Sequence, residues 1–208
     1  MGVAVDERNA LCDLFAEVGP DAPTLCTGWS TRDLAAHLVV RDRRPDTLPG
    51  VALKSFAPHT AKVQGEFAAK PWDELVELVR TGPPRWSPLS LRALGEQVNS
   101  AEFFVHHEDV RRAQPDWQPR PADPARDAMA WRTARGMSRL SFRRSPVGVV
   151  LRRPDGTEAP AKQGPGTVTL NGEPGELLLF AFGRDAVRIE FDGEPESVSA
   201  VKGLKRGF

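Results

Sequence analysis

The segment NSAEFFVHHEDVRRA, residues 99–113, places two histidines and three carboxylates in an otherwise apolar and arginine-rich sequence. The helical pattern around it runs from Leu91 to Ala113, and the proline-rich stretch PDWQPRPADP then breaks the helix. Because each residue of an α-helix advances the direction by about 100°, Glu102, His106 and Asp109 share one stripe. That stripe either decorates a solvated helix or forms one half of a metal site.

A carboxylate and an imidazole at positions i and i+4 can bind one ion, because their tips converge about one turn apart. Two ligands on one helix do not complete a site, so a third must come from another segment. Of the two histidines outside this helix, His37 is preferred because it lies beside the apolar positions of its own helix, whereas His59 follows a proline in an irregular segment. His37, Glu102 and His106 would match the three protein ligands and one open position of catalytic zinc sites. The same donors also suit nickel, iron or manganese.

Structural alternatives exist for these residues. A histidine beside an apolar stripe is often a core residue bonded to a backbone carbonyl, and a glutamate and a histidine four residues apart occur by chance on many helices. Asp109 has three roles open to it: a fourth ligand, a partner of a ligand, or a base near the metal-bound group. Cys26 is read mainly as a small buried residue, with a reactive thiolate as the alternative. The other charged residues of the segment are expected to form a solvated, salt-bridged face: His107, Glu108, Arg111 and Arg112.

Length and composition restrict the class of protein. The 208 residues can bury a substantial core as one large or two small domains. The 28 basic and 28 acidic residues cancel, which argues against a nucleic acid or an anionic membrane as partner. No apolar run approaches the roughly 20 residues that span a bilayer, and no basic-then-apolar leader is present. These features predict a cytoplasmic protein with reduced thiols, as a monomer or a homodimer.

Hydrophobic periodicity predicts an α+β fold class. Residues 1–144 carry helical patterns, including WSTRDLAAHLVVRDRR, where Ser30 is a good N-cap and Asp33 completes a variant of the capping box. After Pro146 the pattern changes to short strands, in VGVVLRRPDGTEAPA around a Pro-Asp-Gly turn and in GTVTLNGEP and AVRIEFDG. Two short helices, GELLLFAFG and PESVSAVKGL, lie among and after these strands. We therefore expect a helical bundle over residues 1–144 and a small α+β domain over residues 146–208.

Two motifs together carry a family resemblance. The segment GWSTRDLAAHLV at residues 28–39, followed by EFFVHHEDVRRA at 102–113, resembles the mycothiol-dependent maleylpyruvate isomerase family of the DinB-like superfamily. The resemblance implies a four-helix bundle followed by a small α+β domain, with His37, Glu102 and His106 as metal ligands. It matches Asp109 to a catalytic position. More loosely, it matches Arg184, in the sequence LLLFAFGRDA, to an arginine that binds substrate or cofactor; the alternative is a solvated arginine at a helix end.

Two further segments, RWSP at residues 85–88 and SPVGVVLRRPDG at 145–156, are similar to an actinobacterial branch described as metal-binding. That branch has no assigned substrate, so this likeness indicates metal chemistry without naming a reaction.

The resemblance also implies a reaction type. A free thiol with a pKa of about 8.5 is largely protonated at neutral pH, and a divalent cation deprotonates it. The thiolate of mycothiol or of a similar small thiol would then attack an electrophilic small molecule. Addition to an unsaturated diacid and later elimination isomerise a double bond, whereas attack on an epoxide or an alkyl halide transfers sulfur. We expect a mycothiol-dependent isomerase or S-transferase that uses zinc, with nickel, iron or manganese as alternatives.

Two other functions stay open at this point. The first is a non-catalytic metal-binding protein, and the second is a hydrolase in which metal-bound water is the nucleophile and no thiol takes part. Solvent access to the open coordination position separates the enzyme from the purely structural site, and thiol binding separates transfer from hydrolysis.

Overall fold

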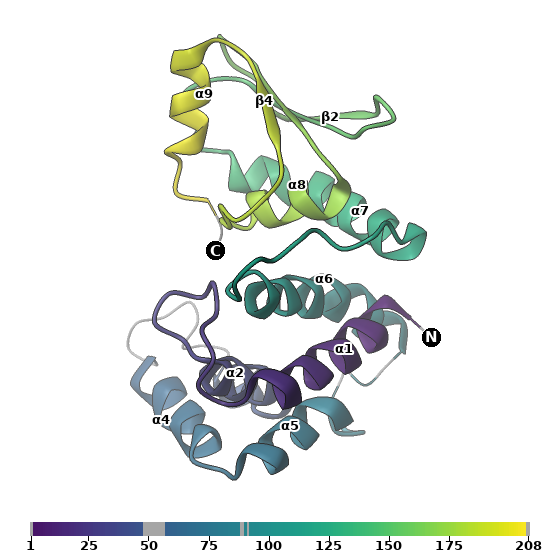
Figure 1. Cartoon of the computed structure of the whole chain (residues 1–208), viewed down its shortest axis with the longest axis vertical. Helices are drawn as coiled ribbons and strands as arrows, with labels where there is room; N and C mark the ends of the chain where they lie inside the picture. The colour runs from purple at the N-terminus through teal and green to yellow at the C-terminus, as the bar shows by residue number, and fades with distance from the viewer. Residues whose placement is uncertain (1, 48–56, 88–89, 91, 207–208) are drawn as a thin grey trace. The chain divides into compact units, whose positions relative to one another are not determined.

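The computed structural model describes residues 2–47, 57–87, 90 and 92–206 (Figure 1). Within these ranges the chain forms eight α-helices, a short 3-10 helix and a four-stranded mixed sheet. By its internal packing the chain divides into two compact units, Met1–Gln118 and Pro119–Phe208. The first unit is helical and the second combines helices with the sheet, which confirms the predicted α+β fold class.

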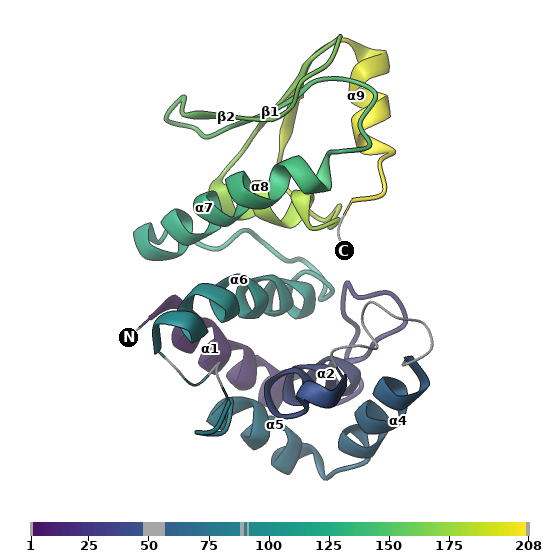
Figure 2. The same ribbon diagram turned by 180° about the vertical axis from the view of Figure 1, so that it is seen from behind.

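The first unit is built around a four-helix bundle. Its members are α1 (Val3–Val18), α2 (Thr31–Arg43), α5 (Trp72–Thr81) and α6 (Arg92–Arg111). Figures 1 and 2 show α1 lying along α6, while the peripheral helix α4 (Ala57–Ala68) packs against α2. The 3-10 helix η1 (Pro45–Thr47) follows α2. The four bundle helices share one core, to which they contribute Leu11, Phe15, Leu34, Leu38, Leu75, Val79, Phe103 and Val110. Burying a side chain of this kind stabilises the fold by about 1.5–3 kcal/mol.

The start of α2 is fixed by the predicted capping box. The Ser30 hydroxyl accepts the backbone amide of Asp33, and the Asp33 carboxylate accepts the backbone amide of Ser30 at 2.9 Å. These two bonds satisfy amide groups that the first turn of a helix leaves unpaired. Since the cap fixes the first residue of α2, it also fixes the direction in which His37 leaves the helix two turns later.

The second unit contains the sheet, in the order β2-β1-β3-β4. Strand β1 (Val149–Arg152) pairs antiparallel with β2 (Glu158–Lys162) and parallel with β3 (Val168–Asn171), and β3 pairs antiparallel with β4 (Glu190–Asp192). The helices are α7 (Pro124–Ser141), α8 (Pro174–Ala181) and α9 (Pro195–Lys202). Gly156 has a φ of 83° in the turn between β1 and β2, a conformation that glycine adopts without strain. The predicted Pro-Asp-Gly hairpin is therefore confirmed.

The packing partners of α7 differ from those predicted. It packs against α8 and β2 and so belongs to the second compact unit, whereas the sequence assigned residues 125–143 to the bundle. The division into domains at residues 144–146 stays a prediction.

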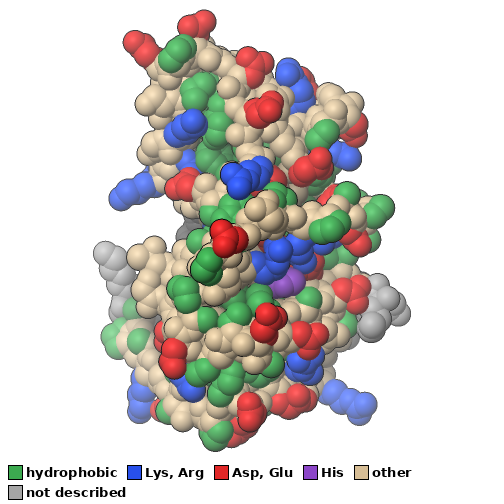
Figure 3. Space-filling view, viewed as in Figure 1, with side chains coloured by type: hydrophobic (Ala, Val, Ile, Leu, Met, Phe, Trp, Pro, Cys, Tyr) green, Lys and Arg blue, Asp and Glu red, His purple; other side chains and the backbone are tan. Residues whose placement is uncertain are grey.

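The surface carries charges of both signs. On the face shown in Figure 3, acidic and basic side chains are interspersed with hydrophobic ones, in keeping with a formal net charge of zero. Among the helices that the structure describes, none combines the length and the apolar character needed to cross a membrane.

Candidate metal centre

The structure brings the three predicted ligands together. Glu102 Oε1 lies 3.5 Å from Nε2 of His37 and 3.4 Å from Nε2 of His106. The two imidazole rings meet edge to face, with their centroids 5.5 Å apart and their planes at 72°. Each residue offers one ligand atom, and the three atoms lie within 4.8 Å of one another. Convergence of α2 and α6 thus completes the set that one helix cannot supply.

The spacing of these atoms fits a small divalent cation. Tetrahedral ligands about 2.0–2.1 Å from a zinc ion are themselves about 3.3–3.4 Å apart. The two distances to Glu102 Oε1, 3.4 and 3.5 Å, correspond to edges of such a tetrahedron. Two imidazole nitrogens and one carboxylate oxygen are also donors that nickel, iron and manganese accept.

Asp109 lies behind His106 with no exposed surface. Its Oδ2 atom is 2.9 Å from Nδ1 of His106, whereas Nε2 of the same ring faces Glu102. A carboxylate in this place fixes the orientation of a metal-binding histidine and raises its basicity. Of the three roles left open by the sequence, the geometry favours a partner of the ligand.

Cys26 is a residue that the sequence interpretation underrated. Its Sγ donates to Asp109 Oδ2 at 3.2 Å and lies 4.0 Å from Nδ1 of His106. Cys26, His106 and Asp109 therefore form a second group whose atoms could hold a metal. The connector carrying Cys26 is held against α6 because the Leu25 amide donates to the carbonyl of Asp109 at 3.0 Å. That connector has no periodic pattern, so this contact could not be predicted from residue spacing.

Arg41 was also not predicted, although it lies four residues after His37 and hence on the same face of α2. Its Nε is 3.3 Å from Glu102 Oε1, and its Nη1 donates to Asn99 Oδ1 at 2.7 Å. The positive charge of Arg41 beside the Glu102 carboxylate therefore favours the ionised form of Glu102.

Charge is strongly coupled within the cluster. Burial on its own raises the pKa of Glu102, but the hydrogen bonds from His106 and His37 and the charges of His106 and Arg41 lower that pKa well below its usual range. Burial likewise lowers the pKa of His106, but hydrogen bonds with Asp109, Cys26 and Glu102 hold it well above its usual range. The cluster thus favours a negative Glu102 carboxylate beside a positive His106 imidazole, and a cation that binds His106 must replace a proton on that ring.

The cluster is open on one side. The side chains of His37 and Glu102 are 30% and 26% exposed, whereas those of His106 and Asp109 are 11% and 0% exposed. Trp29, just before α2, lies against His37, with ring centroids 5.1 Å apart. A ligand can therefore approach past His37 and Glu102.

Two solved structures have a similar fold, and both are crystal structures of the mycothiol-dependent maleylpyruvate isomerase. The chain aligns with one at a TM-score of 0.63 and with the other, a histidine-to-alanine mutant, at 0.62. Each alignment covers 91% of this chain and 90% of the other chain, at 14% sequence identity. This chain has the maleylpyruvate isomerase fold. No family model matches the sequence, and no curated protein matches it closely.

Two other predicted or considered residues lie outside the cluster. His59, the rejected third ligand, is exposed on α4, where its Nε2 lies 2.7 Å from Oδ2 of Asp46. Arg184 follows α8 in the second unit, where its Nη1 donates to the carbonyl of Phe182 at 2.8 Å. Its role toward substrate or cofactor stays a prediction.

The prediction of a solvated face on α6 is wrong, because residues of that face are buried. His107 is buried, and its Nδ1 lies 2.8 Å from Oε2 of the buried Glu7 on α1. Glu108 is buried as well and pairs with Nε of Arg112 at 2.5 Å and with Arg111 at 3.0 Å. The predicted salt bridges exist, but packing encloses them. The pairing partners offset the cost of removing these charges from water.

Proposed function

We propose that this protein is a divalent-metal-dependent enzyme that activates a low-molecular-weight thiol for attack on an electrophilic small molecule. The observation that carries the proposal is that Nε2 of His37 and Nε2 of His106 both lie close to Oε1 of Glu102. The side chains of His37 and Glu102 are partly exposed, so the cluster is open on one side. The fold adds support, because it is shared with the mycothiol-dependent maleylpyruvate isomerase. Mycothiol is therefore our first choice of thiol.

Each residue of the site has a separate task in this proposal. His37, Glu102 and His106 would hold the cation, which we take to be zinc, with nickel, iron or manganese as alternatives. When bound there, the cation supplies the positive charge that converts a thiol into its nucleophilic thiolate. Asp109 keeps the His106 ring oriented, and Arg41 keeps the Glu102 carboxylate ionised and in place.

Isomerisation and S-transfer both begin with attack by the thiolate sulfur on an electrophilic carbon. In isomerisation a carbon–sulfur bond forms and later breaks, so that the thiol returns and the double bond has changed geometry. In S-transfer the carbon–sulfur bond persists and the electrophile's leaving group departs. We assign Arg184 the task of binding a carboxylate of substrate or thiol, as a guanidinium can do with two parallel hydrogen bonds. A cytoplasmic location stays part of the prediction.

The exposure of the cluster favours an enzyme over a purely structural metal site. A structural zinc site has four protein ligands and is closed, whereas a catalytic one keeps a position for water or substrate. The partly exposed side chains of His37 and Glu102 leave such a position accessible. Hydrolysis by metal-bound water remains the alternative, and it differs from the proposal in needing no thiol.

The ligand set is tested by metal analysis of the purified chain and four variants. We expect about one divalent ion per chain in the wild type and a large loss in His37→Ala, Glu102→Gln and His106→Ala. His59→Ala is the matched control, since it removes an exposed histidine outside the cluster, and it should keep the metal. Unchanged metal content in His37→Ala would remove His37 from the site.

The thiol is tested with the Co(II)-loaded chain. Mycothiol should produce a sulfur-to-cobalt charge-transfer absorption that the site variants lack, and turnover of maleylpyruvate or of an epoxide should require that thiol. If the chain keeps its metal but no thiol produces this absorption, thiol activation is overturned. The remaining functions are then hydrolysis and non-catalytic metal binding.

A further inference from the structure

An arginine groove of about 600 Å³ lies in the second unit, between α7 and the edge strand β2. This volume falls within the range of roughly 300–1,000 Å³ that small-molecule pockets have. Helix α7 supplies one wall, with Arg132, Arg135, Gly136 and Arg139, and β2 supplies the other, with residues 158–160. The groove therefore has the size of a ligand site and a lining rich in positive charge.

The three arginines share one face of α7. Arg132, Arg135 and Arg139 are spaced by three and four residues, so they form a single stripe over about 10 Å of the helix axis. All three are exposed. The opposite face of α7 carries Trp131 and Ala134, which are buried. Because the core uses that opposite face, the arginine stripe is available to a ligand.

The positive charge of the groove is not neutralised from within the chain. Among the described residues, no carboxylate pairs with any of the three guanidinium groups. Glu158 in the opposite wall is engaged elsewhere, because its Oε1 lies 2.7 Å from Nε of Arg152 on β1. Other arginines of the chain do have acidic partners, such as Arg80 with Asp13 at 2.7 Å. The groove thus concentrates unpaired cations in a chain whose formal net charge is zero.

Gly136 keeps the groove open. It follows Arg132 by one turn on the same face of α7, and a Cβ atom built on it meets nothing within 4 Å. Glycine is disfavoured in the interior of a helix, so this position keeps its space at some cost to the stability of α7. A larger side chain here would enter the groove and not the core.

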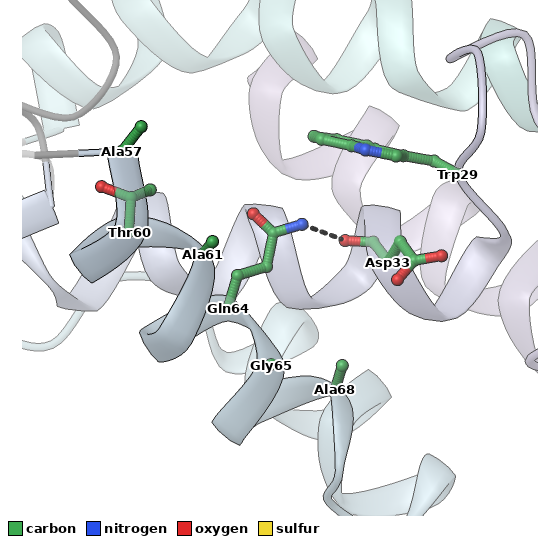
Figure 4. A pocket seen from close by; sticks show the side chains of 8 residues that line it. All are labelled: Trp29, Asp33, Ala57, Thr60, Ala61, Gln64, Gly65 and Ala68. Atoms are coloured by element: carbon green, nitrogen blue, oxygen red, sulfur yellow. Dashed lines mark hydrogen bonds between the residues drawn. The ribbon is translucent and has the colours of Figure 1, made fainter. Parts of the chain in front are cut away.

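A pocket of the first unit provides a contrast (Figure 4). It has a volume of about 400 Å³ and is lined by Trp29, Asp33 and one face of α4, including Gly65. Its described lining contains no lysine, arginine or histidine. A gathering of unpaired cations therefore characterises the arginine groove and does not simply follow from the arginine-rich composition.

We propose that the arginine groove binds an elongated small molecule that carries an anionic group, phosphate or carboxylate, near each end. A guanidinium group binds either anion with two parallel hydrogen bonds. Arg132 and Arg139 stand about 10 Å apart along the helix, so each can hold one end, with Arg135 between them. This binding site is independent of the proposed thiol chemistry, because no residue of the candidate metal centre lines the groove.

The edge strand favours a small molecule over an acidic peptide. Strand β2 pairs with β1 on one side, so an added peptide strand would have to pair along its other edge. Pro160, in the middle of β2 and in the lining of the groove, has no amide hydrogen for such a ladder. Proline is one of the residues by which proteins protect an edge strand from strand addition.

The test is isothermal titration of the full chain with two doubly anionic compounds and their single-ended counterparts. The phosphate pair is fructose bisphosphate and fructose monophosphate, and the carboxylate pair is suberate and octanoate. We expect one of the doubly anionic compounds to bind at least about tenfold more tightly than its counterpart, since only it can engage both ends of the stripe. Which pair shows the difference identifies the anion as phosphate or carboxylate. A buffer with about 0.15 M salt largely screens exposed charges more than about 8 Å apart, which suppresses non-specific attraction.

Variants show whether the binding occurs in the groove. Arg132→Gln and Arg139→Gln each remove one end of the stripe, so the doubly anionic compound should bind no more tightly than its counterpart. Arg144→Gln is the control for charge, because Arg144 is exposed in the same unit and lies outside the described lining. Gly136→Leu fills the groove without changing charge and should also remove the tenfold difference. Gly65→Leu is its control, because a Cβ atom on Gly65 likewise meets nothing within 4 Å.

Three results would overturn the proposal. The first is a wild type that binds neither doubly anionic compound more tightly than its counterpart. The second is equal weakening in Arg132→Gln and Arg144→Gln, which would mean that only the overall charge matters. The third is unchanged binding in Gly136→Leu. Circular dichroism verifies that each variant is folded, as expected for substitutions at exposed positions or into open space.

Discussion

Asp109 Oδ2 lies 2.9 Å from Nδ1 of His106, the ring nitrogen opposite to the one that faces Glu102. One imidazole is therefore held at both nitrogens, by a buried carboxylate behind and by the proposed ligand set in front. Since Asp109 has no exposed side-chain surface, solvent does not compete for this contact. The ring is thus oriented before any ligand arrives.

Replacing Asp109 by asparagine should weaken metal binding while the fold persists. The amide has nearly the same size as the carboxylate but lacks its charge, and loss of such an outer partner lowers metal affinity by about 10–100-fold. Competition with a chromophoric chelator measures the affinity. Cys26→Ser serves as control, because its hydroxyl can still donate to Asp109 and metal affinity should stay near that of the wild type. Equal metal affinity in Asp109→Asn and the wild type would mean that Asp109 does not act through His106.

Replacing Glu7 by glutamine should reduce stability without changing metal content. Glu7 and His107 form a buried contact of 2.8 Å between α1 and α6, and a lost bond to a charged group costs about 1.5–3 kcal/mol. Urea denaturation measures the free energy of unfolding. Asp13→Asn is a control on the same helix, because the Asp13 side chain is 73% exposed and its pair with Arg80 should contribute less than about 1 kcal/mol. A loss of metal in Glu7→Gln would place His107, and not only His106, at the metal centre.

The two cysteines should differ in reactivity. Burial raises the pKa of the Cys12 thiol from 9.0 to about 12, which reduces its thiolate at pH 8 by roughly a thousandfold. Cys26 is only partly buried, so iodoacetamide should modify Cys26 in the folded chain and both cysteines after unfolding. Mass spectrometry of peptides locates the label, and Cys26→Ser should remove labelling of the folded chain. Rapid modification of Cys12 under native conditions would contradict its burial in the core.

Asp42 should make the chain less stable as the pH rises from acid toward neutral. Burial raises the pKa of Asp42 above 3.8, although Arg41 and Arg8 oppose the change. The contribution of this group to stability is complete below about pH 3.8 and is lost as the pH rises through the higher pKa of the folded state. Asp42→Asn removes the titration, so its stability relative to the wild type should increase between pH 3 and pH 7 in urea denaturation.

Asp46 should show the opposite pH dependence of stability in the same urea denaturation experiment. Hydrogen bonds from Arg44 and His59 hold the pKa of this exposed carboxyl below its usual range, so its contribution is present at neutral pH and is lost in acid. Asp46→Asn should therefore lose stability relative to the wild type as the pH rises. The same pH trend in both variants would contradict the burial of Asp42.

The local sequence pattern was sufficient to predict the helices and strands and half of the candidate metal centre. Ser30 and Asp33 identified the start of α2 because a capping box is a contact between residues three apart. Glu102, His106 and Asp109 could be placed on one stripe because the rise and turn of a helix are fixed. His37 followed from the shortage of other histidines and from the family resemblance, and the structure places it beside Glu102.

Only the tertiary structure decided which residues meet the side chains of α6. Cys26 reaches Asp109 from a connector without periodicity, and Glu7 meets His107 across 100 positions of sequence. The neighbouring residues His106 and His107 face different helices, because the ring of His106 meets that of His37 on α2 and His107 pairs with Glu7 on α1. Sequence spacing fixes the direction of a side chain relative to its own helix. Which helix or connector lies in that direction depends on the packing of the whole core, and this packing is set by contacts between residues far apart in the chain.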